Sequence, residues 1–270
     1  EMMDQLMPGT DPECVALVDK ALRKLDCAIH TKAKALSAKV SDKGVSIEAE
    51  IDGKKQVLEA DRLLVAVGFK PNSDLLGLDK AAVKTDAKGF VTVDASGRTS
   101  NTAVWAIGDL VGPPLLAHKA SAEGLAAVAA IAGKKTVKDF RALPAAIFTD
   151  PEIATVGMTE AQAKLEGREV RVGRFPFAAL GRAASVGRTD GFVKLVADAK
   201  TDLILGCQIV GPDASNLIAE AALAIEMGAT AEDLALTVHA HPTFPEALME
   251  AAEAVHGKAI HAPNPGRAKT

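Results

Sequence analysis

The sequence predicts a fold in two parts, an α/β part followed from about residue 142 by an α+β part with an antiparallel sheet. Two observations predict the first part: residues 63–67 and 104–107 are continuous apolar runs, each closed by a glycine, which is typical of strands buried on both faces. A third predicts the second part, because from residue 143 onward short strand-like segments and helical segments occur in an order that suits antiparallel pairing.

The first element is a helix over residues 11–26. Asp11 is a good N-cap and Pro12 suits the first helical position. Val15, Val18 and Leu22 recur at helical spacing, so one face of this helix is expected to be buried.

Three short strands follow, over residues 35–40, 45–51 and 56–59. Asp52-Gly53 between the last two predicts a two-residue hairpin, because both positions require a positive φ. Together with the run closed by Gly68, these elements are typical of the later part of a βαβ domain whose beginning lies outside this chain.

The next segment is rich in turns and contains a short strand over residues 91–93. The apolar run at 104–107 is predicted to be a second buried strand, closed by Gly108-Asp109. A helix over residues 118–132 follows and is expected to end at Gly133.

The last part predicts an α+β domain whose helices lie to one side of an antiparallel sheet. Strands are expected over residues 168–175, 192–196 and 203–210. Helices are expected over residues 160–166, 214–227, 231–236 and 244–256.

Composition excludes several classes of partner. The net charge is -4 and there is no tyrosine, so neither a nucleic acid nor an anionic membrane surface is favoured. No apolar run is long enough to span a bilayer. The cysteines at 14, 27 and 207 form no closely spaced pair, and we interpret them as buried thiols in a reducing cytoplasm.

Gly108-Asp109 is a candidate ligand site, because carboxylates that follow buried parallel strands lie where open α/β sheets bind ligands. The carboxylate can accept hydrogen bonds from sugar-like hydroxyls. Leu116-Ala117-His118 then opens a helix, whose free N–H groups favour negative charge such as that of a reduced flavin. The alternatives are an ordinary turn and a helix that only packs.

The strongest candidate for chemistry is His241, which lies five residues before Glu246 at a predicted helix start. A carboxylate that orients an imidazole makes it a usable proton acceptor near neutral pH. The alternative for Glu246 is a capping box with Thr243. A metal site with His239 lacks further ligands of suitable spacing, so no metal is predicted. The bond before Pro242 is a candidate cis bond.

Six segments of this chain occur together, in the same order, in one known family. They are residues 1–9 (EMMDQLMPG), 64–72 (LVAVGFKPN), 105–112 (WAIGDLVG), 116–120 (LAHKA), 149–157 (TDPEIATVG) and 239–243 (HAHPT). Essentially the whole chain resembles the C-terminal portion of members of the dihydrolipoamide dehydrogenase family. The members of this family are flavoprotein disulfide reductases that use FAD and NAD.

The resemblance implies three regions: residues 1–68 as the C-terminal part of a Rossmann-like NAD-binding domain, 69–141 as a central domain that contacts FAD, and 142–270 as an interface domain. It also implies roles for particular residues. The FAD contacts would be Asp109, which would bond the ribityl chain, and Leu116, Ala117 and His118; the NAD contacts would be Glu1, Ala33 and Gly68.

By the same resemblance, His241 would be the catalytic base and Glu246 its partner, acting across a homodimer on the active site of the other subunit. The family reaction oxidises dihydrolipoamide to lipoamide and reduces NAD. It proceeds through an enzyme disulfide and FAD, and the lipoyl domains of 2-oxo acid dehydrogenase complexes are the expected partners.

The chain departs from the family pattern in lacking the redox disulfide and the Gly-rich loops of the FAD and NAD sites. We therefore expect the chain alone to be inactive, with FAD and NAD binding dependent on an N-terminal part that precedes it. Two alternatives stay open: a non-catalytic dimerisation or interaction module, and a reductase of the same family with another disulfide or a quinone as substrate.

Overall fold

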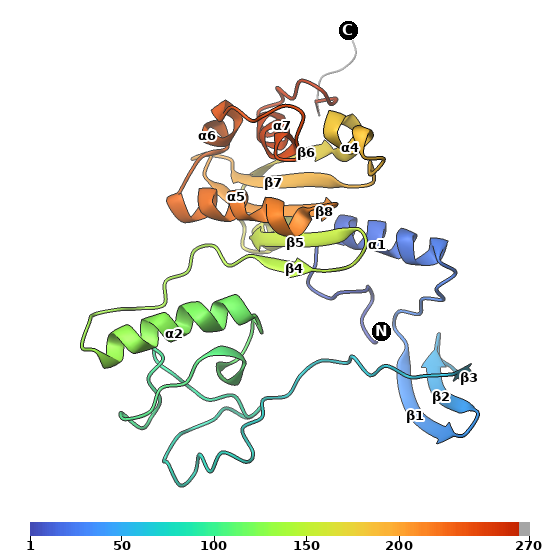
Figure 1. The fold of residues 1–270 in the computed structure, drawn as a ribbon, viewed down its shortest axis with the longest axis vertical. Coiled ribbons are helices and arrows are strands. Elements are labelled where there is room, and N and C mark those ends of the chain that lie inside the picture. The colour runs from blue at the N-terminus through green and yellow to red at the C-terminus, as the bar shows by residue number, and fades with distance from the viewer. Residues whose placement is uncertain (265–270) are drawn as a thin grey trace. The chain divides into compact units, whose positions relative to one another are not determined.

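Figure 1 shows the chain as a computed structural model, which describes residues 1–264. The chain forms two compact units. One contains residues 1–63 together with the chain from Arg141 onward, and the other contains residues 64–140. The first and last segments, which we predicted as separate domains, therefore share one unit.

The larger unit begins with helix α1 (Pro12–Lys24), as predicted. The side chain of Asp11 caps it by accepting a hydrogen bond from the Glu13 amide. An antiparallel three-stranded sheet follows, made of β1 (Lys34–Ser41), β2 (Gly44–Ile51) and β3 (Lys54–Ala60). Asp52 and Gly53 both have positive φ, so the predicted hairpin turn is confirmed.

The second sheet has five strands in the order β4-β5-β8-β7-β6, and every pair is antiparallel. They are β4 (Ala145–Ile147), β5 (Glu152–Gly157), β6 (Val170–Pro176), β7 (Phe192–Asp198) and β8 (Ile204–Gly211). The sequence predicted the last three of these strands and missed the first two.

The helices of this unit lie close to their predicted places. They are α3 (Glu160–Leu165), α4 (Gly181–Ser185), α5 (Ala214–Met227), α6 (Ala231–Leu236) and α7 (Glu246–Val255), with a 3-10 turn η2 (Phe177–Ala179) before α4. The short α4 was not predicted. α5 ends at Gly228, whose φ of +69° is the left-handed cap that the sequence indicated.

The five-stranded sheet is covered on both faces (Figure 1). Alternate strand residues such as Leu195 and Ile209 pack with α5, α6 and α7 in the main core. The opposite residues, Phe192 and Val210, pack with Val18 of α1. We predicted helices on one side only; the cover of the second face comes from the beginning of the chain.

A buried lysine fastens α1 to this face. The ammonium of Lys194 on β7 lies 2.8 Å from the Asp11 carboxylate and also bonds Glu13. Burial alone would lower the pKa of Lys194, but the bonds to the two carboxylates outweigh it, so the pKa lies above its ordinary value. We call Lys194, Asp11 and Glu13 the clasp.

The smaller unit contains a 3-10 turn η1 (Gly108–Val111) and the helix α2 (Ala117–Ile131), which confirms the predicted helix. The strand predicted at 91–93 is reduced to a bridge between Thr85 and Val91. The small core of this unit consists of Val83, Val91 and Ala106.

The two buried parallel strands predicted in the first part are wrong. Residues 63–67 are irregular, and Leu64, Val65 and Val67 are 87%, 68% and 91% exposed. At 104–107, only a bridge from Trp105 to Arg98 forms. A buried parallel strand needs a neighbouring strand to pair with, and among the described residues both sheets are antiparallel and contain neither segment.

Within residues 1–264 no helix is both long and apolar enough to cross a membrane.

Candidate functional site

The His241–Glu246 pair lies at the start of α7. Nδ1 of His241 is 2.8 Å from a carboxylate oxygen of Glu246. The His241 side chain is 74% exposed, whereas that of Glu246 is 15% exposed. The two side chains therefore meet, and the imidazole faces outward, where a second molecule can reach it.

Glu246 performs two tasks at once. Its second carboxylate oxygen accepts a hydrogen bond from the Thr243 amide at 2.7 Å, which is one half of a capping box. The other half is absent, because the Thr243 hydroxyl donates to the Ala240 carbonyl and Pro245 takes the N-cap position. The capping alternative and the pairing with His241 are thus compatible.

Electrostatics keep Glu246 ionised. Burial by itself would raise the pKa of its carboxyl. Hydrogen bonds from the Thr243 amide and the His241 ring outweigh burial, so the pKa lies below its ordinary value. An ionised Glu246 that accepts from Nδ1–H leaves Nε2 of His241 as the ring nitrogen able to take up a proton.

The loop that carries His241 is anchored on both sides. Phe244 is buried and its ring lies 5.5 Å from that of Phe177. Two residues before His241, the ring of His239 is bonded on both nitrogens, to the Thr237 carbonyl and to Glu220, each at 2.7 Å. The bond between His241 and Pro242 is cis, as the sequence allowed.

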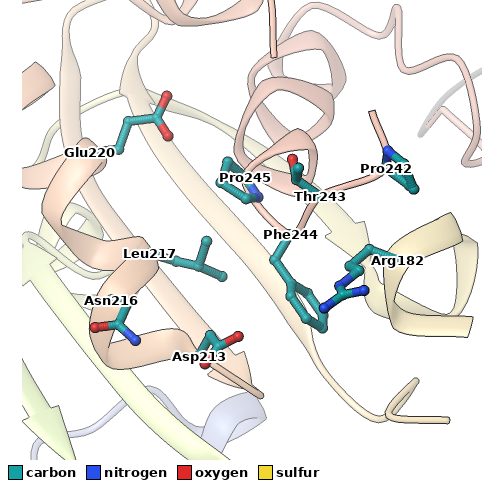
Figure 2. A pocket seen from close by; sticks show the side chains of 9 residues that line it. All are labelled: Arg182, Asp213, Asn216, Leu217, Glu220, Pro242, Thr243, Phe244 and Pro245. Atoms are coloured by element: carbon teal, nitrogen blue, oxygen red, sulfur yellow. The ribbon is translucent and has the colours of Figure 1, made fainter. Parts of the chain in front are cut away.

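A pocket of about 540 Å³ adjoins this loop. Figure 2 shows its lining side chains, which come from α4, from the N-cap and first half of α5 and from the loop before α7: Arg182, Asp213, Asn216, Leu217, Glu220, Pro242, Thr243, Phe244 and Pro245. A Cβ placed on Gly181 would lie 3.7 Å from Cε1 of His241, so the imidazole lies against the start of α4.

The second group of candidate residues lies in the smaller unit. Asp109 is exposed on η1 and lines a pocket of about 230 Å³ together with Phe69, Lys70, Pro71, Asn72, Phe90, Leu110 and Leu115. Leu116 is the N-cap of α2, and no side chain caps this helix start, which Ala117 and His118 continue. The structure thus brings the Asp109 turn and the chain leading into α2 together at one pocket.

Two buried charges that the sequence analysis missed hold this turn. Lys119 donates to the carbonyls of Gly108 and Gly112 at 3.3 and 2.8 Å, and Glu123 accepts from the Gly108 amide at 2.7 Å. Both side chains are almost fully buried and lie 3.6 Å apart. The available signal was a Lys and a Glu four residues apart in an alanine-rich helix.

Two of the three residues chosen for NAD, Glu1 and Ala33, lie in the same unit and contact each other. The Ala33 amide donates to the Glu1 carbonyl at 2.9 Å, and the Glu1 carboxylate accepts from the Met3 amide. Gly68 belongs to the other unit, with an exposed backbone at φ +115°.

The cysteines correct one prediction. Cys14 and Cys207 are buried as expected, but Cys27, just beyond α1, is exposed. Burial is the main cause that raises the pKa of Cys14 to about 12, and burial also raises that of Cys207.

Comparisons with known proteins agree with this architecture. A model of the pyridine nucleotide-disulphide oxidoreductase family matches residues 1–124, and a model of the dimerisation domain of the same family matches residues 143–252. The chain belongs to the pyridine nucleotide-disulphide oxidoreductase family. Its predicted mixed α/β fold with an antiparallel sheet in the dimerisation domain is thereby confirmed.

Within this family, the chain is similar to curated dihydrolipoyl dehydrogenases. The chain is 49% identical over 263 residues to dihydrolipoyl dehydrogenase from Thermus scotoductus, covering 97% of the chain and 57% of that protein. It is 47% identical over 257 residues to the Geobacillus stearothermophilus protein of the same name, covering 95% and 55%. The chain thus spans little more than half the length of these relatives.

Solved structures show the same fold. LpdA from Mycobacterium tuberculosis superimposes with a TM-score of 0.86 at 27% identity, over 93% of this chain and 55% of that one. The HOCl-induced flavoprotein disulfide reductase RclA from Escherichia coli gives 0.84 at 25% identity, over 92% and 57%.

Proposed function

We propose that this chain is the C-terminal part of a dihydrolipoyl dehydrogenase in which His241 is the catalytic base. The observation that carries the proposal is the hydrogen bond between Nδ1 of His241 and Glu246, combined with the exposure of the imidazole. The identity of 49% and 47% to two dihydrolipoyl dehydrogenases supports the choice of reaction.

The proposed reaction begins with proton transfer. Nε2 of His241 takes the proton of one dihydrolipoamide thiol, and the resulting thiolate attacks one sulfur of an enzyme disulfide, whose other sulfur leaves as a thiolate. The second substrate thiol passes its proton to the first enzyme thiolate. Its sulfur then attacks the substrate sulfur of the mixed disulfide, which closes lipoamide and releases the second enzyme sulfur as a thiolate. His241, held as an imidazolium by Glu246, returns its proton to solvent.

When bound, FAD would supply the two-electron chemistry that links the reduced enzyme sulfurs to NAD. The smaller unit fits one side of such a cofactor. The exposed Asp109 carboxylate suits the hydroxyls of a ribityl chain, and the uncapped start of α2 at Leu116, Ala117 and His118 suits an anionic ring edge. Lys119 and Glu123 fix the turn that presents Asp109.

Glu1, Ala33 and Gly68 remain the residues proposed for NAD, and the adjacency of Glu1 to Ala33 supports this for two of the three. The dimerisation domain supports a homodimer in which His241 of one subunit serves the disulfide of the other. Lipoyl domains of 2-oxo acid dehydrogenase complexes would then be the partners that deliver substrate, in the cytoplasm. The cysteine spacing of the 270 residues provides no redox pair, so we expect the chain alone not to turn over.

The experiment that tests this proposal is His241→Gln in the full-length enzyme. We expect dihydrolipoamide-dependent reduction of NAD to fall roughly 100-fold or more, because loss of a general base has about that effect, while the flavin spectrum is retained. His256→Gln is the matched control, since it breaks another histidine–carboxylate pair, with Asp202, at the other end of α7. Near-normal turnover by His241→Gln would refute the proposal.

A substrate panel tests the competing reductase function. The structural similarity to RclA, a HOCl-induced flavoprotein disulfide reductase, is the reason to include other disulfides and quinones. We expect dihydrolipoamide to have the highest kcat/KM of the panel. A higher value for another substrate with His241 still required would assign the base to a different reaction.

A further inference from the structure

Helix α7 carries two glutamates with the same arrangement of partners. Glu246 binds a backbone amide, that of Thr243, with one oxygen and Nδ1 of His241 with the other. Glu250, one turn later, binds the Ile260 amide at 2.9 Å with one oxygen and Nδ1 of His261 at 2.6 Å with the other. Both imidazoles are largely exposed, at 74% and 67%.

The spacing of the two carboxylates creates an electrostatic problem. Residues four apart on a helix lie on the same face about one turn from each other, where like charges repel. Glu250 is almost fully buried, with a side-chain exposure of 2%. A buried carboxylate without a compensating partner is strongly unfavourable, and its field would also act on the Glu246–His241 pair.

His261 compensates this charge. Its ring and its own amide, together with the Ile260 amide, supply the hydrogen bonds to Glu250. Burial raises the pKa of the Glu246 carboxyl, and the hydrogen bonds from Thr243 and His241 lower it. A smaller electrostatic contribution from His261 lowers it further. The influence of His261 therefore extends one turn, to the carboxylate that holds His241.

We infer that His261 and Glu250 form a positioning pair for the proposed base: the hydrogen bonds from His261 satisfy the buried Glu250 carboxylate one turn from Glu246, so that Glu246 holds His241 without interference from an uncompensated neighbour. The inference rests on the proposed function of His241. It assigns no direct contact between His261 and substrate. Its consequence is that the acid limb of the pH–rate profile depends on the balance of charge between His261 and Glu250.

Other charged groups near α7 act in the same way in every variant of the experiment. They lie on the helix itself, on α4 and α6, on β6 and β7 and in the neighbouring loops: Glu253, Arg182, Glu232, Asp233, Arg171, Arg174, Lys194, Asp202, His239, His256 and Lys258. Arg171 and His256 both lie within ion-pair distance of Asp202, and Lys194 belongs to the clasp on the opposite face.

The test uses three variants of the full-length enzyme and the pH dependence of kcat with dihydrolipoamide. His261→Asn removes the imidazole that bonds Glu250 and leaves that buried carboxylate uncompensated near the Glu246–His241 pair, so the acid limb should move to higher pH. Glu250→Gln leaves His261 uncompensated, so the limb moves to lower pH. Each shift should be roughly half a pH unit. The double variant should return close to wild type.

This pattern of signs separates the inference from a structural role. Two variants that merely loosen α7 would both lower kcat without moving the limb in opposite directions. An unmoved limb in His261→Asn, or shifts of the same sign in the two single variants, would overturn the inference. If Glu250→Gln does not retain flavin, His261→Lys takes its place: it keeps the charge, so its limb should stay within a few tenths of a pH unit of wild type, roughly.

The fate of the proposed function is decided separately. If His241→Gln is active, His241 is not the base, whatever the three variants do. If His241→Gln is inactive and the limb is indifferent to His261 and Glu250, the base assignment stands and the positioning pair is refuted.

Discussion

The dimerisation-domain part of the chain and the segment from about residue 61 to 108 behave differently, and the difference separates two kinds of sequence signal. In the former, helix caps and turns fix the elements locally, and α5 ends at the glycine that the sequence indicated. In the latter, the apolar run at 63–67 has the composition of a buried strand but remains exposed, because strand formation there requires partners at a distance.

The largest expected effect that tests this contrast comes from two single substitutions to alanine in the 270-residue chain, one in each region. Leu248 is fully buried in the main core, so Leu248→Ala should lower the free energy of unfolding by about 2–5 kcal/mol. Val67 is 91% exposed, so Val67→Ala should change the free energy of unfolding by less than about 0.5 kcal/mol. Chemical denaturation followed by circular dichroism measures both, and equal losses would contradict the contrast.

A smaller effect is expected at the clasp. Asp11 is only 4% exposed, and Lys194→Met removes the cation that pairs with its carboxylate. The free energy of unfolding should therefore fall by about 3 kcal/mol. Lys194→Met with Asp11→Asn should lose less, because asparagine keeps the N-cap without the charge. Thermal unfolding of the two variants checks this, and a double variant no better than the single one would argue against an uncompensated charge.

The smallest effect concerns thiol reactivity and leaves stability unchanged. Cys27 is exposed and should react with a thiol reagent in the native chain at pH 8. Cys14, whose pKa burial raises to about 12, and the buried Cys207 should stay unmodified until the chain unfolds. Mass spectrometry after brief labelling counts the modified thiols, and early modification of Cys14 would show that α1 detaches readily.

Much of the site could be predicted because its signals are short in range. His241 and Glu246 are five residues apart at a helix start, a spacing that allowed both their pairing and a capping box, and the structure contains the hydrogen bond between them. Asp109 followed from its place after an apolar run, although that run forms no strand. Local spacing made both residues candidates, and the family resemblance then favoured a functional role over a turn and a capping box.

The residues that were missed depend on contacts that no local pattern reveals. Glu250 pairs with His261 across the end of α7, and Lys194 meets Asp11 from 183 residues away. Lys119 and Glu123 were overlooked for another reason. Charged residues on a helix are usually exposed, and here both face inward because the Gly108 turn has backbone groups that need partners.

The clasp has a consequence for how the polypeptide can be divided. α1 packs on the same sheet that the chain builds after Arg141. Residues 64–140 therefore form an insertion in a larger unit whose two outer parts are joined by noncovalent contacts. Protease cuts near residues 63 and 140 would therefore excise the middle piece and leave the two outer peptides associated. The order of segments along the sequence therefore differs from their grouping in the folded protein, where the first and last segments belong together.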